Sequence, residues 1–357
     1  MTDLVLDGGG LTVDGVTEVA RGARRVAVAE AVWLRIDAAR EVVERYAEGN
    51  EPVYGLNTGL GGNLGHRLAP DEIAAFQVQL IRGRAVALGP PFSTEVVRAA
   101  LIARANGIAN GASGVSRPVL AMLVELLNRG VTPVVPSRGS IGAADLAPMA
   151  HIGLVMLGLG EAQFQGRVLP GSEALRQAGL QPATLGPKDG LGLINANAVT
   201  VGHAALVLSD ARRLLLTAAA TAALACEGYA ANPSTFDART AALRKAPGQE
   251  SAAALFRALL EGSSLAETDA PRVIQDALSF RCLPQIAGAA LHALADAIAA
   301  TETELNAAAD NPAVLVDDDV ILSTGNFHLA ALALAFDSLA LALGQVAHAG
   351  MARIVKL

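Results

Sequence analysis

The sequence is poor in cysteine, in aromatic residues and in charge. Its 357 residues include two cysteines, 3% aromatic residues and 17% charged residues. Cys226 and Cys282 lie far apart in the chain, so neither a disulfide framework nor a zinc-binding pattern follows, and a reducing cytoplasm is the expected compartment. The scarcity of aromatic residues argues against a sheet-rich fold, because aromatic and β-branched residues favour strands.

The sequence also has no basic run and no targeting segment. The formal net charge is −7, and an acidic chain of this kind is a poor binder of nucleic acid or of a membrane surface. The opening MTDLVLDGGG lacks the basic and apolar regions of a signal peptide. The apolar run near 214–226 is too short to span a bilayer, and the longer run around 328–351 contains Asp337, Gln345 and His348. We therefore expect both runs to be buried core helices.

Alanine and leucine dominate the second half of the chain. Hydrophobic residues make up 52% of the sequence, and Ala/Leu-rich segments near 193–227, 284–308 and 326–357 predict long helices that bury against one another as a bundle. Further helices are expected over 24–48, from 71 and over 119–127, and LVLDGGGLTVDG at the start predicts a small hairpin. We predict an all-α (mainly α) fold with one domain over 1–357, comprising an N-terminal part (1–190) and a central helical bundle (191–357).

Four segments rich in Gly, Asn or Pro interrupt the helical pattern. They are YGLNTGLGGNLGHR (54–67), GSIGAADLAPMAH (139–151), QDALSFRCLPQ (275–285) and STGNFH (323–328). Breaks of this kind often lie where a ligand approaches the backbone closely. The spacing in GLGGNLG is not that of a dinucleotide-binding loop, and the six histidines lack metal-ligand spacing, so no metal site is predicted.

Together with GLGLINANA and ADNP, these segments resemble motifs of the histidine, phenylalanine and tyrosine ammonia-lyases, in the same order and at similar spacing over nearly the whole chain. The resemblance implies the long-helix bundle of the L-aspartase/fumarase type and an α,β-elimination of ammonia from an amino acid. In that family an internal Ala-Ser-Gly cyclises to a methylidene-imidazolone (MIO), the electrophile that activates the leaving group. The resemblance also implies a cytoplasmic homotetramer with sites shared between subunits, acting on a small amino-acid-like substrate.

The resemblance assigns a role to several residues. Tyr54 matches the base that acts on the β-carbon, Arg281 matches the arginine that binds the substrate carboxylate, and Asn195 matches the asparagine beside cofactor and amino group. The alternative roles are ring packing for Tyr54, a structural ion pair for Arg281 and backbone hydrogen bonding for Asn195. The remaining matches to substrate-binding positions are Gln275, Leu278, Gln285 and Phe327, although Phe327 also suits a plain core position.

Three departures from the family pattern bear on the chemistry. Gly142, Ala143, Ala144 and Asp145 stand where the family has Gly-Ala-Ser-Gly-Asp, so one residue is missing and no serine is present to lose water. No cofactor is therefore expected, unless the printed residues conceal a modified Ala-Ser-Gly. Leu278 stands where the family usually has tyrosine. The family also continues past residue 357 with more helices, which predicts an oligomer or a separate chain that supplies the remaining part.

The position that selects the substrate ring in the family lies just after QLI. Counting through QLIRGRA places Arg84 there, with Arg82 and Gly83 as near misses. A guanidinium suits an anionic or strongly polar substrate tail, whereas a solvated or ion-paired arginine is the alternative.

Three functions are compatible with these residues. The first is a carbon–nitrogen lyase that works without the electrophile on a substrate whose amine is already a good leaving group, as in ergothionase-like relatives that release trimethylamine from a betaine of thiol-histidine. The second is an ordinary ammonia-lyase or aminomutase with a concealed MIO. The third is a non-catalytic homologue or binding subunit. We favour a lyase, because Tyr54 and Arg281 are both retained.

Overall fold

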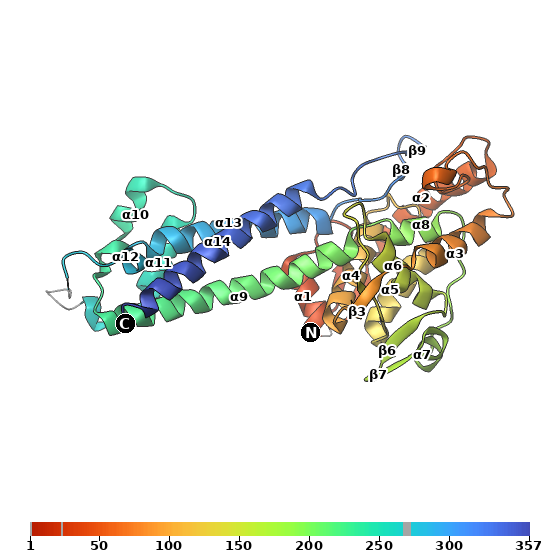
Figure 1. Cartoon of the computed structure of the whole chain (residues 1–357). Helices are drawn as coiled ribbons and strands as arrows, with labels where there is room; N and C mark the ends of the chain where they lie inside the picture. The colour runs from red at the N-terminus through yellow and green to blue at the C-terminus, as the bar shows by residue number, and fades with distance from the viewer. Residues whose placement is uncertain (1, 23, 267–272) are drawn as a thin grey trace. The chain divides into compact units, whose positions relative to one another are not determined.

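The computed structural model describes residues 2–22, 24–266 and 273–357, which form two compact units. The first unit comprises the chain up to Leu206 together with Thr301–Leu329, and the second comprises Val207–Ala300 together with Ala330–Leu357. Both units are built mainly of helices, which confirms the predicted fold class (Figure 1).

The first unit is organised around helix α4 (Thr94–Ala109), from which every residue between Val96 and Ala109 is buried. α4 packs against α1, α2 and α5, and its alanines allow close approach. At Gly202, near the start of α9, an added Cβ would lie 2.6 Å from the backbone of Ala99. The helices of this unit are α1 (Val13–Gly22), α2 (Glu30–Glu48), α3 (Ile73–Arg84), α4, α5 (Arg117–Arg129), α6 (Leu146–Met156), α7 (Gly171–Gln177), α8 (Asp189–Ile194) and the start of α9 (Ala198–Tyr229).

The strands of the first unit are short. β3 (Leu88–Pro91) pairs with β5 (Pro136–Arg138), β8 (Ala313–Leu315) pairs with β9 (Val320–Leu322), and β4 (Thr132–Pro133), β6 (Glu161–Phe164) and β7 (Arg167–Pro170) form a three-stranded sheet. These small sheets connect helices, and Ala162, Phe164 and Val314 contribute buried side chains to the core.

The N-terminal hairpin that we predicted is not formed. β1 (Leu4–Leu6) instead pairs in parallel with β2 (Val26–Val28), and α1 forms the crossover between them. The reason is a local turn, in which Asp7 Oδ1 accepts hydrogen bonds of 2.9 Å from the N–H groups of Gly9 and Gly10. This turn leads the chain into α1, so the second apolar stretch becomes helical.

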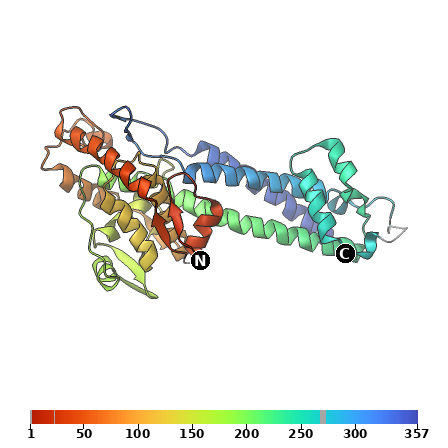
Figure 2. The same ribbon diagram turned by 180° about the vertical axis from the view of Figure 1, so that it is seen from behind.

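The second unit contains α10 (Ala238–Arg244), α11 (Gln249–Leu259), α12 (Leu278–Arg281) and α14 (Ala330–Ile354), with the adjoining parts of α9 and of α13 (Leu283–Leu305). Its parts of α9, α13 and α14 run alongside one another (Figures 1 and 2). Two ring pairs stack in its core, Tyr229 with Phe280 at 4.3 Å and Phe236 with Phe256 at 5.0 Å between centroids. These contacts fix the short helices around α12, which carries part of the motif QDALSFRCLPQ.

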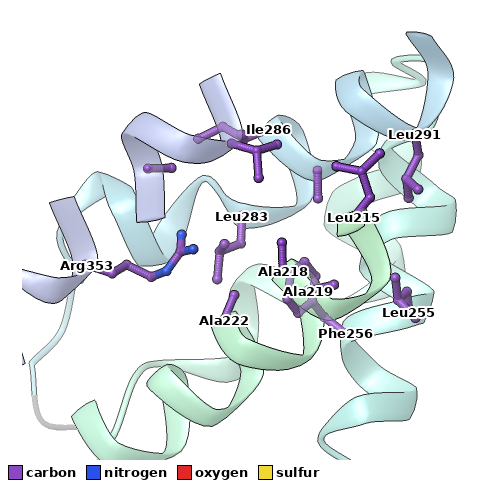
Figure 3. Close-up of a pocket in the computed structure, with 13 residues that line it drawn as sticks. Leu215, Ala218, Ala219, Ala222, Leu255, Phe256, Leu283, Ile286, Leu291 and Arg353 are labelled. Atoms are coloured by element: carbon purple, nitrogen blue, oxygen red, sulfur yellow. The ribbon is translucent and has the colours of Figure 1, made fainter. Parts of the chain in front are cut away.

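Figure 3 shows the interior of the second unit, where α9, α11, α13 and α14 enclose a narrow apolar space of about 20 Å³. The guanidinium of Arg353 projects into it and donates a hydrogen bond of 3.0 Å to the carbonyl of Ser279. Burial lowers the pKa of Arg353. Since a cavity of this size holds about one water molecule, the four helices are closely packed here.

Three helical stretches are long and apolar enough, by length and composition, to cross a membrane: Asp189–Tyr229, Leu283–Leu305 and Ala330–Ile354. Their most apolar windows are 83%, 39% and 11% buried. The predicted burial is wrong for both runs within the chain itself: along 214–226 only one side of α9 is buried, with Leu214 and Leu224 58% and 69% exposed, and α14 is mostly exposed. One side of α14 packs through Leu332, Leu339, Ala349 and Arg353, whereas Leu334 and Leu341 remain 69% and 75% exposed.

Candidate active site

The loop that carries Tyr54 is held at its base by its own polar side chains. Asn57 Oδ1 accepts a hydrogen bond of 2.8 Å from the N–H of Val53, and Asn57 Nδ2 donates to the carbonyls of Tyr46 and Glu51. Asn57 is 2% exposed, whereas Tyr54 is only partly buried. The loop thus has a fixed base from which the Tyr54 phenol is accessible.

Gln77 on α3 connects this loop to α8. Its Nε2 donates to the carbonyl of Gly55 at 3.0 Å, and its Oε1 accepts the N–H of Leu191 at 2.9 Å. Gly55 has φ +66°, and an added Cβ there would lie 2.4 Å from Leu191 Cδ2. Because α8 ends at Ile194, just before Asn195, a single buried amide sets the Tyr54 loop relative to the Asn195 segment.

The degenerate cofactor motif forms a tight turn before α6. Gly142 and Ala144 have φ +78° and +61°, and Ala144 is buried. The N–H of Asp145 donates to the carbonyl of Ala196 at 2.8 Å, while its carboxylate accepts the N–H and the hydroxyl of Thr200 at 2.8 and 2.9 Å. Asp145 thereby satisfies an N–H in the first turn of α9. Burial raises its pKa, and the hydrogen bonds from Thr200 and Ser140 act in the opposite direction.

The Asn195 segment forms hydrogen bonds with the two remaining motifs of the first unit, ADNP and GNFH. Asn195 Nδ2 donates to the carbonyl of Asn311 at 2.6 Å, and Asn197 Nδ2 donates to the carbonyl of Phe327 at 2.8 Å. The segments INANA, ADNP and GNFH are therefore joined by side-chain hydrogen bonds. Asn195 is 7% exposed, and its Nδ2 is used in a hydrogen bond to the backbone. Its Oδ1 can still accept a hydrogen bond from a ligand.

A group of buried charges lies beside this segment. Arg104 pairs with Asp310 at 2.8 Å, with both side chains 1% exposed, and also donates to the carbonyl of Leu193 at 3.1 Å. Lys188 Nζ donates to the carbonyl of Ser113 at 2.5 Å, and burial lowers the pKa of Lys188 to about 8. Asp189 pairs with Arg40 at 3.2 Å. These charges fix both ends of the segment that presents Asn195.

Arg84 lies in the last turn of α3 and lines a groove of about 610 Å³ together with residues of the Tyr54 loop. The side chain is exposed. The first unit thus brings the Tyr54 loop next to the position predicted to select the substrate tail.

The second unit carries the other predicted site residues. Arg281 ends α12 and is half-buried, with its carbonyl accepting a hydrogen bond of 2.5 Å from Thr235 Oγ1. Gln275 is exposed, and Leu278 is 62% exposed. Gln285 Oε1 is buried without a hydrogen-bond partner among the described residues. An unsatisfied buried acceptor and exposed side chains next to Arg281 suit a surface that meets a ligand or another chain.

Comparison with known proteins identifies the family of the chain. The model of the family described as aromatic amino acid lyase matches residues 11–357. The histidine ammonia-lyase of Symbiobacterium thermophilum is 42% identical over 351 residues, covering 98% of this chain and 69% of that protein.

The chain belongs to the aromatic amino acid lyase family. It is a lyase of the histidine and aromatic ammonia-lyase type. Two solved structures are similar to it. The ergothioneine-degrading enzyme ergothionase from Treponema denticola, in complex with desmethyl-ergothioneine sulfonic acid, has a TM-score of 0.96 at 32% identity, covering 99% of this chain and 71% of that one. Histidine ammonia-lyase from Trypanosoma cruzi has a TM-score of 0.90 at 30% identity, covering 99% and 67%.

The imidazolone that the family resemblance implies does not fit the residues present. Ala143 and Ala144 have no hydroxyl group whose loss as water would create the methylidene carbon. The nearby Ser140 precedes the turn, its hydroxyl is hydrogen-bonded to Asp145, and it accepts the N–H of Gly142 at 3.4 Å.

Sequence reasoning missed several residues that build the site. Gln77, Lys188, Arg104 and Asp310 are all buried and polar, and each contacts the backbone or a charge next to a recognised motif. A polar residue on the apolar side of a helical stretch, such as Gln77 in FQVQLI, was the available signal.

Proposed function

We propose that this lyase eliminates a tertiary amine from an amino-acid-like betaine and does so without the imidazolone. The observation that carries the proposal is the turn at 142–145, which is one residue shorter than the family motif and lacks the serine that the electrophile requires. The similarity to ergothionase supports it, because that enzyme is described as degrading ergothioneine.

The chemistry follows from the leaving group. Ammonia leaves an amino acid poorly, which is why an electrophile is needed to activate it. A quaternary ammonium departs as a neutral amine, so a base and a carboxylate-binding group suffice. A betaine therefore matches a site that keeps Tyr54 and Arg281.

In the proposed elimination the Tyr54 oxygen takes the proton from Cβ. The electrons of the Cβ–H bond form the Cα=Cβ double bond, and those of the Cα–N bond leave with the amine. The products are an α,β-unsaturated carboxylate, a neutral trialkylamine and one proton, which passes from Tyr54 to solvent. Arg281 would bind the carboxylate as a planar fork, and Asn195 would orient the substrate.

We further propose that the working enzyme is a cytoplasmic homotetramer whose sites combine residues of different copies, with no membrane or nucleic acid as partner. Tyr54 and Asn195 belong to the first unit, whereas Arg281 and Gln285 belong to the second. One side of α14 exposes apolar residues that include Leu334 and Leu341, and another copy would cover it. The native mass also tests whether a separate chain joins the assembly.

The first test is the intact mass of the purified protein together with its ultraviolet difference spectrum after nucleophile treatment. Imidazolone formation removes two waters and adds an absorbance that nucleophiles bleach. We expect the mass of the printed sequence, no such absorbance, and release of trimethylamine from α-trimethylammonium betaines of aromatic or heteroaromatic amino acids. Unmodified protein that releases no amine from any of these betaines would refute the proposal.

The alternative is an ordinary histidine or aromatic ammonia-lyase, or an aminomutase. It is favoured by the 42% identity to a protein named histidine ammonia-lyase. A mass lower by two waters and a bleachable absorbance would select it, and histidine, tyrosine and phenylalanine would then be the substrates to assay.

A further inference from the structure

The groove between the Tyr54 loop and α3 has two kinds of wall. Its volume is about 610 Å³. One kind is apolar, formed by Leu60, Leu68, Phe76 and Leu80. The other is polar, formed by Asn63, His66, Gln79 and Arg84. A planar ring suits the apolar wall, and hydrogen-bond acceptors on that ring suit the polar one.

The polar wall contains hydrogen-bond donors and the Arg84 guanidinium but no carboxylate among its described lining residues. Within the described part of the chain, neither Arg84 nor His66 forms an ion pair, and both side chains are exposed. A guanidinium with no acidic residue in the same groove to neutralise it, next to an imidazole that can donate a hydrogen bond, attracts a negatively charged or strongly polarised group.

His66 is tied to the loop that carries Tyr54. Its carbonyl accepts the N–H of Gly59 at 2.9 Å, and its own N–H donates to the carbonyl of Asn63 at 3.0 Å. Thr58 and Arg67 form a bridge across the same turn. The turn is tight, because a Cβ added to Gly59 would lie 2.4 Å from the Asn63 carbonyl oxygen. A group that binds His66 therefore restrains the whole turn next to α3.

We propose that Arg84 and His66 bind an anionic or strongly polarised substituent, such as a thiolate or sulfonate, on the ring of the substrate. This inference rests on the proposed function, since it takes the groove as the place of the substrate ring. His66 gives the substituent a second effect: by fixing the loop against α3, it positions Tyr54. Arg84 thus determines affinity, and His66 is a positioning residue as well.

The test uses two ligands that differ only in this substituent: the trimethylammonium betaine of histidine and its imidazole 2-sulfonate. Their affinities for the full chain are measured by titration calorimetry. We expect the sulfonate to bind at least about tenfold more tightly, because a charge-assisted hydrogen bond contributes about 1.5–3 kcal/mol. Equal affinities, or no binding of the sulfonate, would overturn the inference.

Variants distinguish the role of Arg84 from that of His66. Arg84→Met should abolish the preference, whereas Arg82→Met, an exposed arginine of the same helix that does not line the groove, should keep it. For the matching 2-thiol betaine, His66→Asn should lower kcat several-fold more than it lowers kcat for the unsubstituted betaine. Equal losses for both substrates would remove the positioning role.

Binding and turnover are read separately, so the two proposals fail in different ways. A sulfonate preference that Arg84→Met abolishes, without amine release from any betaine, supports the groove assignment and refutes the elimination. Amine release without a sulfonate preference supports the elimination and overturns the groove assignment.

Discussion

Lys188 is a fully buried ammonium whose described polar contact is the carbonyl of Ser113. Burial lowers its pKa from 10.5 to about 8, against the attraction of Asp310 and Asp189. The unfolded chain therefore binds more protons than the folded one between pH 8 and 10.5. Stability must rise with pH across that window, and the cost of the buried charge is fully present below it.

Replacing this lysine should remove that pH dependence. From pH 8 to pH 10 the group should add about 2 kcal/mol to the free energy of unfolding of the unmodified protein. Lys188→Met should lack this rise, whereas Lys245→Met, at an exposed site, should keep it. Urea unfolding of all three proteins at both pH values gives the comparison. A parallel pH dependence in Lys188→Met and unmodified protein would contradict the assignment.

The Arg104–Asp310 pair should be far more important for stability than a surface pair. Arg104→Met leaves the Asp310 carboxylate buried and unpaired, so we expect a loss of about 3–5 kcal/mol in the free energy of unfolding. Arg176→Met removes the exposed pair with Glu173 and should leave the unfolding midpoint nearly unchanged. Chemical denaturation measures both, and similar midpoints for the two variants would show that the buried pair has no special weight.

At the scale of elements, the Tyr54 loop offers a matched pair of glycines. Gly55 and Gly61 both have positive φ, but an added Cβ at Gly55 would meet Leu191 at 2.4 Å and Leu60 at 2.8 Å, whereas Gly61 has nothing within 4 Å. Gly61→Ala should lower the free energy of unfolding by about 1–2 kcal/mol, through backbone strain alone. Gly55→Ala should lower the free energy of unfolding by about 1–3 kcal/mol more, because its side chain overpacks the contact with α8.

Activity should separate these two glycines more sharply than stability. Gly55→Ala pushes the loop away from α8, so kcat for amine release should fall at least about tenfold, as expected for a misplaced base. Gly61→Ala should keep most of the activity. Steady-state kinetics at saturating substrate distinguishes them. Equal kcat values in the two variants would mean that contact with α8 does not position Tyr54.

The sequence predicted the long helices, but it did not predict the N-terminal turn or the buried polar residues that connect the motifs. Ala/Leu periodicity located α9, α13 and α14 to within a few residues. The N-terminal hairpin failed because Asp7 closes a turn that leads into a helix, which alternation of apolar residues does not reveal. Tyr54, Asn195 and Phe327 were assigned by resemblance, whereas Gln77 and Lys188 were missed, because long-range hydrogen bonds leave no local pattern in a single sequence.

At the scale of the whole molecule, the site residues divide between two units of the chain. Tyr54 belongs to one unit, and Arg281 belongs to the other. If each site takes Tyr54 from one copy and Arg281 from another, two inactive variants can restore each other's activity. If both came from the same copy, mixing would have no effect, because no chain in the mixture carries the two intact residues.

Tyr54→Phe and Arg281→Met should each be inactive alone. Coexpressed with different tags and purified as a mixed assembly, they should recover roughly a quarter of the activity, because chance pairing supplies an intact Tyr54 and an intact Arg281 to one site in four. Tyr54→Phe coexpressed with the double variant Tyr54→Phe/Arg281→Met should stay inactive, since no intact Tyr54 is present. A mixed assembly of the two single variants without activity would place both residues in a site built by one copy, and would contradict the shared-site arrangement.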